Sequence, residues 1–186
     1  VVKSKGIADN WFINSGIPYT IFRTGAIFGP GDQFTEPIAR LLRRSPGFFL
    51  IPEEGKSLLQ PLWVEDLVTC LVWALDNERI LNETLEIGGP EYLTFRQVLE
   101  LIMDTIDTRR RLLPTRPPYL RGLTVFLEAI FPGLPVSVYW LDYLATNRTC
   151  TLDTIPRTFN LMPSRMAQNL GYLEDKDWRQ SLLKIL

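Results

Sequence analysis

The stretch Ser15–Phe34, SGIPYTIFRTGAIFGPGDQF, decides the fold class of this chain. Tyr19–Phe22 is a short run of aromatic and β-branched residues between chain-breaking glycines and prolines, which predicts a buried parallel strand. Gly29-Pro30-Gly31 then forces a turn just before Asp32. Because open α/β sheets bind ligands at the carboxyl ends of their strands, this turn marks a candidate site.

Further along the chain, helix-like and strand-like segments alternate, which predicts an α/β fold with parallel pairing. Thr94-Phe95-Arg96-Gln97 has the pattern of a capping box, in which the Thr94 hydroxyl accepts from the amide of Gln97 and the Gln97 side chain reaches back. By residue number, the other expected strands are 48–51 and 85–87, and the expected helices are 5–15, 37–43, 65–76 and 98–106.

The pattern changes near residue 114. Prolines concentrate between Pro114 and Pro135, so we divide the chain into an α/β part, residues 1–113, and a helical tail, residues 114–186. The tail helices are expected at 117–131, 136–146 and 163–170. Their aromatic stripes could serve a cofactor or a membrane surface. Amphipathic helices of soluble domains usually face a core, so we expect the tail to pack on the α/β part.

Composition excludes several classes of function. A chain of 186 residues is long enough to bury one hydrophobic core. Its net charge of −1 lacks the excess positive charge that is typical of nucleic-acid-binding proteins. We interpret Arg109–Arg111 as a solvated helix end rather than a phosphate site. No apolar run approaches the ~20 residues that span a bilayer. The absence of His makes a zinc site very unlikely. The distant Cys70 and Cys150 are expected to be free thiols in a reducing, cytoplasmic compartment, and one disulfide between them is the alternative.

Residues 23–32 resemble the late RPxxxFGPGD segment of the extended and atypical short-chain dehydrogenase/reductase superfamily. The likeness is greatest to the branch that holds the nucleotide-binding subunit of respiratory complex I and NmrA-like proteins. Gln60–Val68, QPLWVEDLV, resembles the family's hVDDvA segment, whose aspartate, here Asp66, caps a helix. The resemblance implies the C-terminal part of a Rossmann-like doubly wound parallel sheet, with a mainly helical substrate-side lobe.

The resemblance also implies cofactor-binding residues for NAD or NADP. In the superfamily, a Tyr-x-x-x-Lys pair precedes this strand, and its lysine binds the nicotinamide ribose and assists catalysis. Lys5, followed by an acid at Asp9, matches that lysine, and Val1 then occupies the tyrosine position; Lys3 is the alternative counterpart. Small residues after the strand suit close approach to a flat nicotinamide ring: Thr24, Gly25, Ala26 and Ile27.

For a small-molecule substrate, the resemblance points to Arg23, Asp32 and Gln60. Arg23 either binds an anionic group or holds the loop through Asp32. In nucleotide-sugar epimerases and dehydratases, an arginine grips the diphosphate where this chain has Leu59. An aliphatic side chain cannot make those charge-assisted hydrogen bonds, which weakens the sugar-nucleotide interpretation.

The dinucleotide fingerprint G-x-G-x-x-G of the superfamily has no match in this chain, which begins with Val1. We therefore expect a part of a longer NAD(P)-binding protein that is inactive by itself. Strand edges and apolar faces without partners then predict self-association or pairing with the missing N-terminal half.

Two functions of the longer protein follow. One is an oxidoreductase or epimerase that acts on a small or lipid-like substrate. The other is a catalytically silent cofactor-holding protein that serves assembly or redox sensing. Val1 and Leu59, in place of the tyrosine and the arginine, favour the second. A helical interaction module without any cofactor is a third, weaker hypothesis.

Overall fold

The computed structural model describes residues 2–116, 118–119, 122, 147 and 149–174. The α-helices are α1 (Val2–Asn14), α2 (Thr35–Arg44), α3 (Val64–Ala74), α4 (Phe95–Thr105) and α7 (Thr154–Phe159). Short 3-10 helices span Glu78–Ile80, Met166–Gln168 and Gly171–Leu173. The strands are β1 (Thr20–Thr24), β2 (Ile27–Phe28), β3 (Phe48–Pro52), β4 (Leu58–Leu59), β5 (Leu62–Trp63), β6 (Glu83–Ile87), β7 (Leu93–Thr94) and β8 (Arg111–Thr115).

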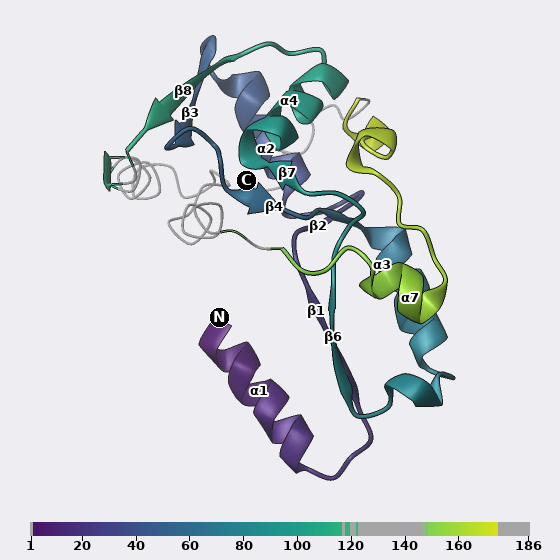
Figure 1. Ribbon diagram of the computed structural model, residues 1–186. Helices are drawn as coiled ribbons and strands as arrows, with labels where there is room; N and C mark the ends of the chain where they lie inside the picture. Colours follow the sequence, from purple (N-terminus) through teal and green to yellow (C-terminus); the bar gives the residue numbers. More distant parts are fainter. Residues whose placement is uncertain (1, 117, 120–121, 123–146, 148, 175–186) are drawn as a thin grey trace, which may run out of the picture.

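The predicted strand in the opening stretch is β1, and it pairs in parallel with β6, from Thr20 opposite Glu83 to Thr24 opposite Ile87. Figure 1 shows this long ribbon with α3 and α7 on one side and α1 on the other. The parallel strand is confirmed, but its expected interior position is wrong. β1 is half-buried at its start and exposed at its end, because β6 is its one strand partner among the described residues.

Three further pairings join the other strands of the described residues. β2 pairs with β5 and β3 with β8 in parallel, whereas β4 pairs with β7 antiparallel. The parallel pairs confirm the predicted α/β class. The division of the chain after residue 113 falls inside β8, where Leu113 lies opposite Leu50 and Pro114 opposite Ile51; the two-part organisation itself stays a prediction.

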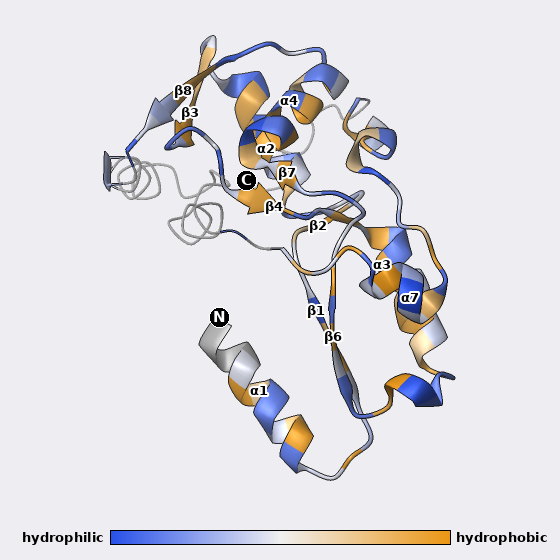
Figure 2. Ribbon diagram, in the orientation of Figure 1, coloured by the Kyte–Doolittle hydropathy of each residue, from blue (hydrophilic) through white to orange (hydrophobic). Residues whose placement is uncertain are grey.

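The main core lies between α2, α4 and residues 149–174, which we call the C-terminal segment. Figure 2 shows apolar stripes on both helices. Their buried residues join the last described residues of the chain in one cluster, which includes Leu42, Leu99, Ile102, Leu170 and Leu173. A second cluster joins α3, β6 and α7 through Cys70, Ile87, Ile155 and Phe159. The tail residues 155–173 therefore pack on the α/β part.

The capping box of α4 is confirmed. Thr94 Oγ1 accepts from the amide of Gln97 at 3.2 Å, and Gln97 Oε1 accepts from the amide of Thr94 at 2.8 Å. The interpretation of the arginine run as a solvated helix end is wrong for Arg110, whereas Arg109 and Arg111 are exposed. Arg110 follows α4 in a loop, and its guanidinium donates to the carbonyl oxygens of Leu42 and Arg43 at 2.9 and 3.3 Å. It thus satisfies carbonyls at the end of α2, where a positive charge also suits the helix dipole.

The tail follows its prediction less well. The expected helices 117–131 and 136–146 lie largely outside the described residues. The expected helix 163–170 is wrong, because this segment is extended before two 3-10 helices. Tertiary hydrogen bonds bind two of its amides: Ser164 N donates to Asp66 Oδ2 at 2.7 Å, and Met166 N donates to Glu91 Oε1 at 3.3 Å.

Two helices keep large apolar side chains at the surface. On α1, Trp11 is 64% exposed, on α3, Val72 is 55% exposed, and Leu75, directly after α3, is 82% exposed. Among the described residues, no helix has both the length and the hydropathy needed to cross a bilayer. Cys70 and Cys150 are free thiols, as predicted.

Candidate functional site

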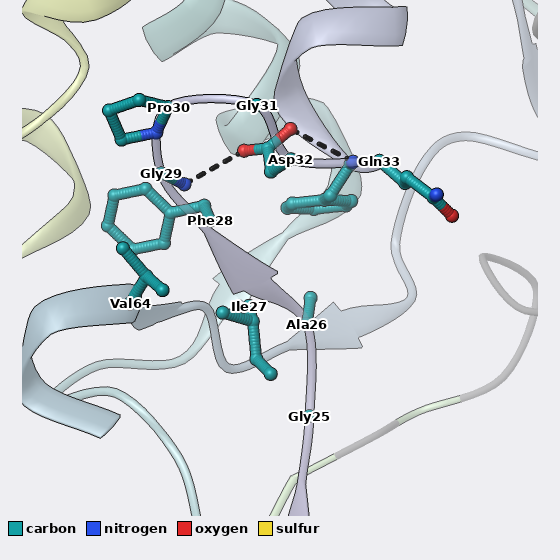
Figure 3. A pocket seen from close by; sticks show the side chains of 11 residues that line it. Gly25, Ala26, Ile27, Phe28, Gly29, Pro30, Gly31, Asp32, Gln33 and Val64 are labelled. Atoms are coloured by element: carbon teal, nitrogen blue, oxygen red, sulfur yellow. Dashed lines mark hydrogen bonds between the residues drawn. The ribbon is translucent and has the colours of Figure 1, made fainter. Parts of the chain in front are cut away.

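A cavity of about 460 Å³ opens beside the glycine-rich turn. Residues 25–34 form most of its wall, and Val64 at the start of α3 closes one side (Figure 3). Three of the four predicted nicotinamide-side residues, Gly25, Ala26 and Ile27, line this cavity. Thr24 lies just outside it and lines a neighbouring cavity, to which Gly25 also contributes.

Close backbone contact fixes the shape of the turn. The amide of Leu62 donates to the carbonyl of Ala26 at 2.8 Å, and β2 continues beside β5. A Cβ atom at Gly29 would lie 2.4 Å from Cγ1 of Val64, so a side chain has no room there. Gly31 has φ +83°, a backbone conformation that favours glycine.

Asp32 organises the turn from within. Its Oδ1 accepts from the amides of Phe34, Thr35 and Glu36 at 3.0, 2.8 and 3.0 Å. Its Oδ2 accepts from the amide of Gly29 at 2.9 Å and from the Thr35 hydroxyl at 2.6 Å. Asp32 therefore caps α2 and closes the turn at the same time.

Because of these hydrogen bonds, the turn differs from a phosphate-binding cradle. Such a cradle presents backbone amides at a helix N-terminus to the anion. Here the carboxylate of Asp32 already accepts from Gly29 and the first amides of α2, and Glu36 Oε1 accepts from the amide of Gly31 at 2.6 Å. The cavity wall is made of small, apolar and backbone groups, and Asp32 is the sole titratable residue among those that line it. Such a wall suits a flat ring better than a diphosphate.

A second cavity, of about 270 Å³, lies at the carboxyl ends of β1 and β6. Arg23, Thr24, Gln60, Glu86 and Cys150 are among its lining residues. Because parallel strands end here side by side, this is the sheet edge at which the sequence predicted a ligand site.

Gln60 borders this second cavity, but it is 1% exposed and its polar atoms serve the protein. Its Nε2 donates to the carbonyl of Gly89 at 2.8 Å, and its Oε1 accepts from the amide of Cys150 at 2.8 Å. A Cβ atom at Gly88 would lie 2.5 Å from Cδ of Gln60, so glycine is required at that position. The geometry makes Gln60 a link between three chain segments.

Arg23 pairs with α1. Its Nε and Nη2 donate to Asp9 Oδ2 at 3.2 and 3.0 Å, joining β1 to the helix that carries Lys5. The alternative that Arg23 holds the loop through Asp32 is wrong, since Asp32 serves the turn and α2 instead. Lys5 lies in α1, one helical turn before Asp9.

Other sequence-derived roles also change. Asp66 was expected to cap α3, but it accepts from the amide of Ser164 in the tail. Leu59, where epimerases carry an arginine, is fully buried in the main core. Sequence reasoning missed Tyr172, whose hydroxyl donates to Asp32 Oδ2 at 3.0 Å. The two residues are 140 positions apart, and no local motif signals their contact.

No family model matches this chain. Over 158 residues it is 27% identical to the NADH dehydrogenase [ubiquinone] 1 alpha subcomplex subunit 9, mitochondrial, of Arabidopsis thaliana, a match that covers 82% of this chain and 39% of that protein. The chain is related to the extended short-chain dehydrogenase/reductase superfamily. The superfamily relationship read from residues 23–32 is thereby confirmed.

Solved structures of superfamily enzymes share the fold. A UDP-glucose 4-epimerase from Thermotoga maritima superposes with a TM-score of 0.59 at 17% identity, over 97% of this chain and 52% of that one. An epimerase from Methanothermobacter thermautotrophicus gives a TM-score of 0.65 at 14% identity, over 97% and 48%. The dTDP-glucose 4,6-dehydratase DesIV from Streptomyces venezuelae, solved with NAD bound, gives 0.58 at 16% identity, over 90% and 46%. The Rossmann-like fold class is thus confirmed.

The chain spans about half the length of these solved structures and 39% of the curated relative. That relative is mitochondrial, and the expected cytoplasmic location stays a prediction.

Proposed function

We propose that this chain forms the nicotinamide-side wall of an NAD(P)-binding protein of the superfamily. The observation that carries the proposal is the cavity beside Gly25–Ile27, whose small residues and backbone leave space for a flat ring. Lys5, on the adjoining helix α1, is the residue we assign to the nicotinamide ribose. The diphosphate and the adenosine then need residues outside this wall, because the turn's own carboxylates occupy its amides.

Among the two hypotheses for the longer protein, the catalytically silent one has more support. The residues of the large cavity include a single titratable group, Asp32, and its oxygens accept hydrogen bonds from the turn and α2. Leu59 is buried where the sugar-nucleotide enzymes carry their arginine. The three residues assigned to a substrate, Arg23, Asp32 and Gln60, each bind another part of the chain. We therefore propose that they shape the walls, and that the protein holds a cofactor for assembly or redox sensing.

We further propose that the exposed faces are contact surfaces for a dinucleotide-binding half. The edge of β1 opposite β6, which pairs with no other strand of the described residues, presents backbone groups that a parallel strand could pair with. Helices α1 and α3, which carry exposed apolar residues, flank the same ribbon (Figure 1). Whether that half belongs to the same polypeptide or to a partner, its docking would cover the apolar surface.

Nicotinamide mononucleotide tests the nicotinamide-side wall directly. Titrated at millimolar concentration into the chain, it should shift the backbone amide resonances of Gly25, Ala26 and Ile27. AMP, which represents the other half of the dinucleotide, should leave them unchanged. Gly25→Val should abolish the shifts by filling the cavity. Ala167→Val adds bulk at an exposed position away from the cavity and should retain them.

Two outcomes would overturn parts of the proposal. Equal shifts with AMP, or shifts confined to other residues, would contradict the assignment of the wall. Micromolar affinity of the chain for NADH or NADPH would contradict the need for a separate dinucleotide-binding half.

A further inference from the structure

The hydroxyl of Tyr172 reaches the carboxylate that organises the glycine turn. It donates to Asp32 Oδ2 at 3.0 Å and lies 2.5 Å from Oγ1 of Thr35. The same Oδ2 accepts from the amide of Gly29, a residue of the cavity wall. A single oxygen atom therefore joins the C-terminal segment to the turn beside the cavity.

The position of Tyr172 is fixed from several sides. Leu170 and Leu173 are 1% and 0% exposed in the main core. The guanidinium of Arg43, at the end of α2, donates to the carbonyl of Leu173 at 3.3 Å. The Tyr172 ring also lies 6.1 Å, between centroids, from that of Trp63. These contacts fix the position of the Tyr172 phenol beside Asp32.

The Tyr172 hydroxyl also stays protonated. Burial, with a contribution from the negative charge of Asp32, raises the pKa of Tyr172 above its usual range. Asp32 in turn is partly buried, and the structure gives its carboxylate hydroxyl and amide donors rather than a cation among the described residues. Each donor helps to hold this charge where water is partly excluded.

We propose that Tyr172 is a positioning residue of the cavity: through Asp32 it holds the Gly29–Gly31 turn in the conformation that shapes the wall. The C-terminal segment thereby controls a site more than a hundred residues earlier in the sequence. The importance of this control for ligand binding rests on the proposed function, but the hydrogen-bonded link itself does not.

Tyr172→Phe removes the hydroxyl and keeps the ring against Trp63. Tyr92→Phe is the matched control, because it removes a hydroxyl that donates to the carbonyl of Cys150 at 2.7 Å, away from the turn. Amide hydrogen exchange without ligand is the first measurement. Loss of one hydrogen bond to a charged group should speed exchange at Gly29, Thr35 and Glu36 by about tenfold to a hundredfold. The Gly29 amide proton resonance should also move.

Exchange in α4, at Leu99 and Ile102, should stay unchanged in both variants. That comparison separates a local positioning effect from a general loss of stability. Unchanged exchange and resonance at Gly29 in folded Tyr172→Phe would overturn the proposal, as would equal acceleration at the α4 amides or the same effect in Tyr92→Phe.

Nicotinamide mononucleotide supplies the second measurement. Its affinity should fall severalfold in Tyr172→Phe and stay unchanged in Tyr92→Phe. If the turn loosens but the wild-type chain shows no shifts with this ligand, the positioning role stands and the proposed function fails. If the ligand binds both chains equally and the turn does not loosen, the positioning role fails and the proposed function stands.

Discussion

Oε1 of Gln60 accepts hydrogen bonds from both the backbone amide and the thiol of Cys150, at 2.8 and 3.2 Å. The same side chain donates to the carbonyl of Gly89 at 2.8 Å. One buried amide therefore joins the β4–β5 connection, the end of β6 and the C-terminal segment. A substrate would have to displace these contacts to bind Gln60, which is why we assign it to the wall rather than to the ligand.

Gln60→Ala should lower the free energy of unfolding by about 1–3 kcal/mol. The substitution leaves a carbonyl and an amide without their partner in a place that water does not reach. Urea denaturation measures the effect. Gln168→Ala, at an exposed position of a 3-10 helix, is the control and should change little. Equal stability of the two variants would contradict the role of Gln60.

Gly29→Ala should destabilise the protein by about 1–3 kcal/mol, because the added methyl would overlap Val64. Val64→Ala should recover part of that loss in the double variant, since it removes the atoms with which the new methyl collides. Thermal unfolding of the two single variants and the double variant gives the coupling energy. Gly171→Ala meets nothing within 4 Å and serves as the control. Strictly additive effects at Gly29 and Val64 would rule out the steric explanation.

The thiol of Cys70 predicts a pH dependence of stability. Burial, with a contribution from the charge of Asp66, raises its pKa from the ordinary value of 9.0 to about 11. Between these values the unfolded chain loses the thiol proton while the folded chain keeps it. The free energy of unfolding therefore falls as the pH rises from 9 toward 11, by up to about 1.4 kcal/mol per pH unit from this group.

Cys70→Ala removes this titration, and its cavity cost does not depend on pH. The difference in stability between wild type and Cys70→Ala should therefore shrink from pH 8 to pH 11 in urea denaturation. A constant difference across that range would show that the thiol does not titrate as the structure requires.

The exposed apolar faces of α1 and α3 predict self-association of the chain. Light scattering should give a mass that rises with protein concentration. The double substitution Trp11→Lys and Val72→Lys should reduce this association, because it places charges on both faces. Met162→Lys changes a residue that is 80% exposed on neither helix, so it should have no such effect. A wild-type chain that stays monomeric at high concentration would argue against these surfaces as contact sites.

Local sequence patterns predicted the elements that depend on neighbouring residues. The capping box of α4 needs residues within one helical turn, and both of its hydrogen bonds are present. The strand after Gly16 and its parallel pairing were likewise predicted from the local residue composition. Its burial was not, because burial depends on which strands lie beside β1, and that information is not local.

The roles of polar residues near the site were harder to predict for the same reason. Asp32, Gln60 and Asp66 were each assigned from a motif or from resemblance. All three accept hydrogen bonds from the C-terminal segment, at Tyr172, Cys150 and Ser164. These partners lie 90 to 140 positions away, and no spacing rule connects them.

This arrangement has a consequence for synthesis on the ribosome. Cys150, Ser164 and Tyr172 are translated after the strands and the turn that form both cavities. A nascent chain that ends before residue 150 leaves Asp32, Gln60 and Asp66 without donors that the finished protein supplies. On a translating ribosome, the turn and the strands around both cavities therefore emerge before the donors that bind Asp32, Gln60 and Asp66 in the finished fold.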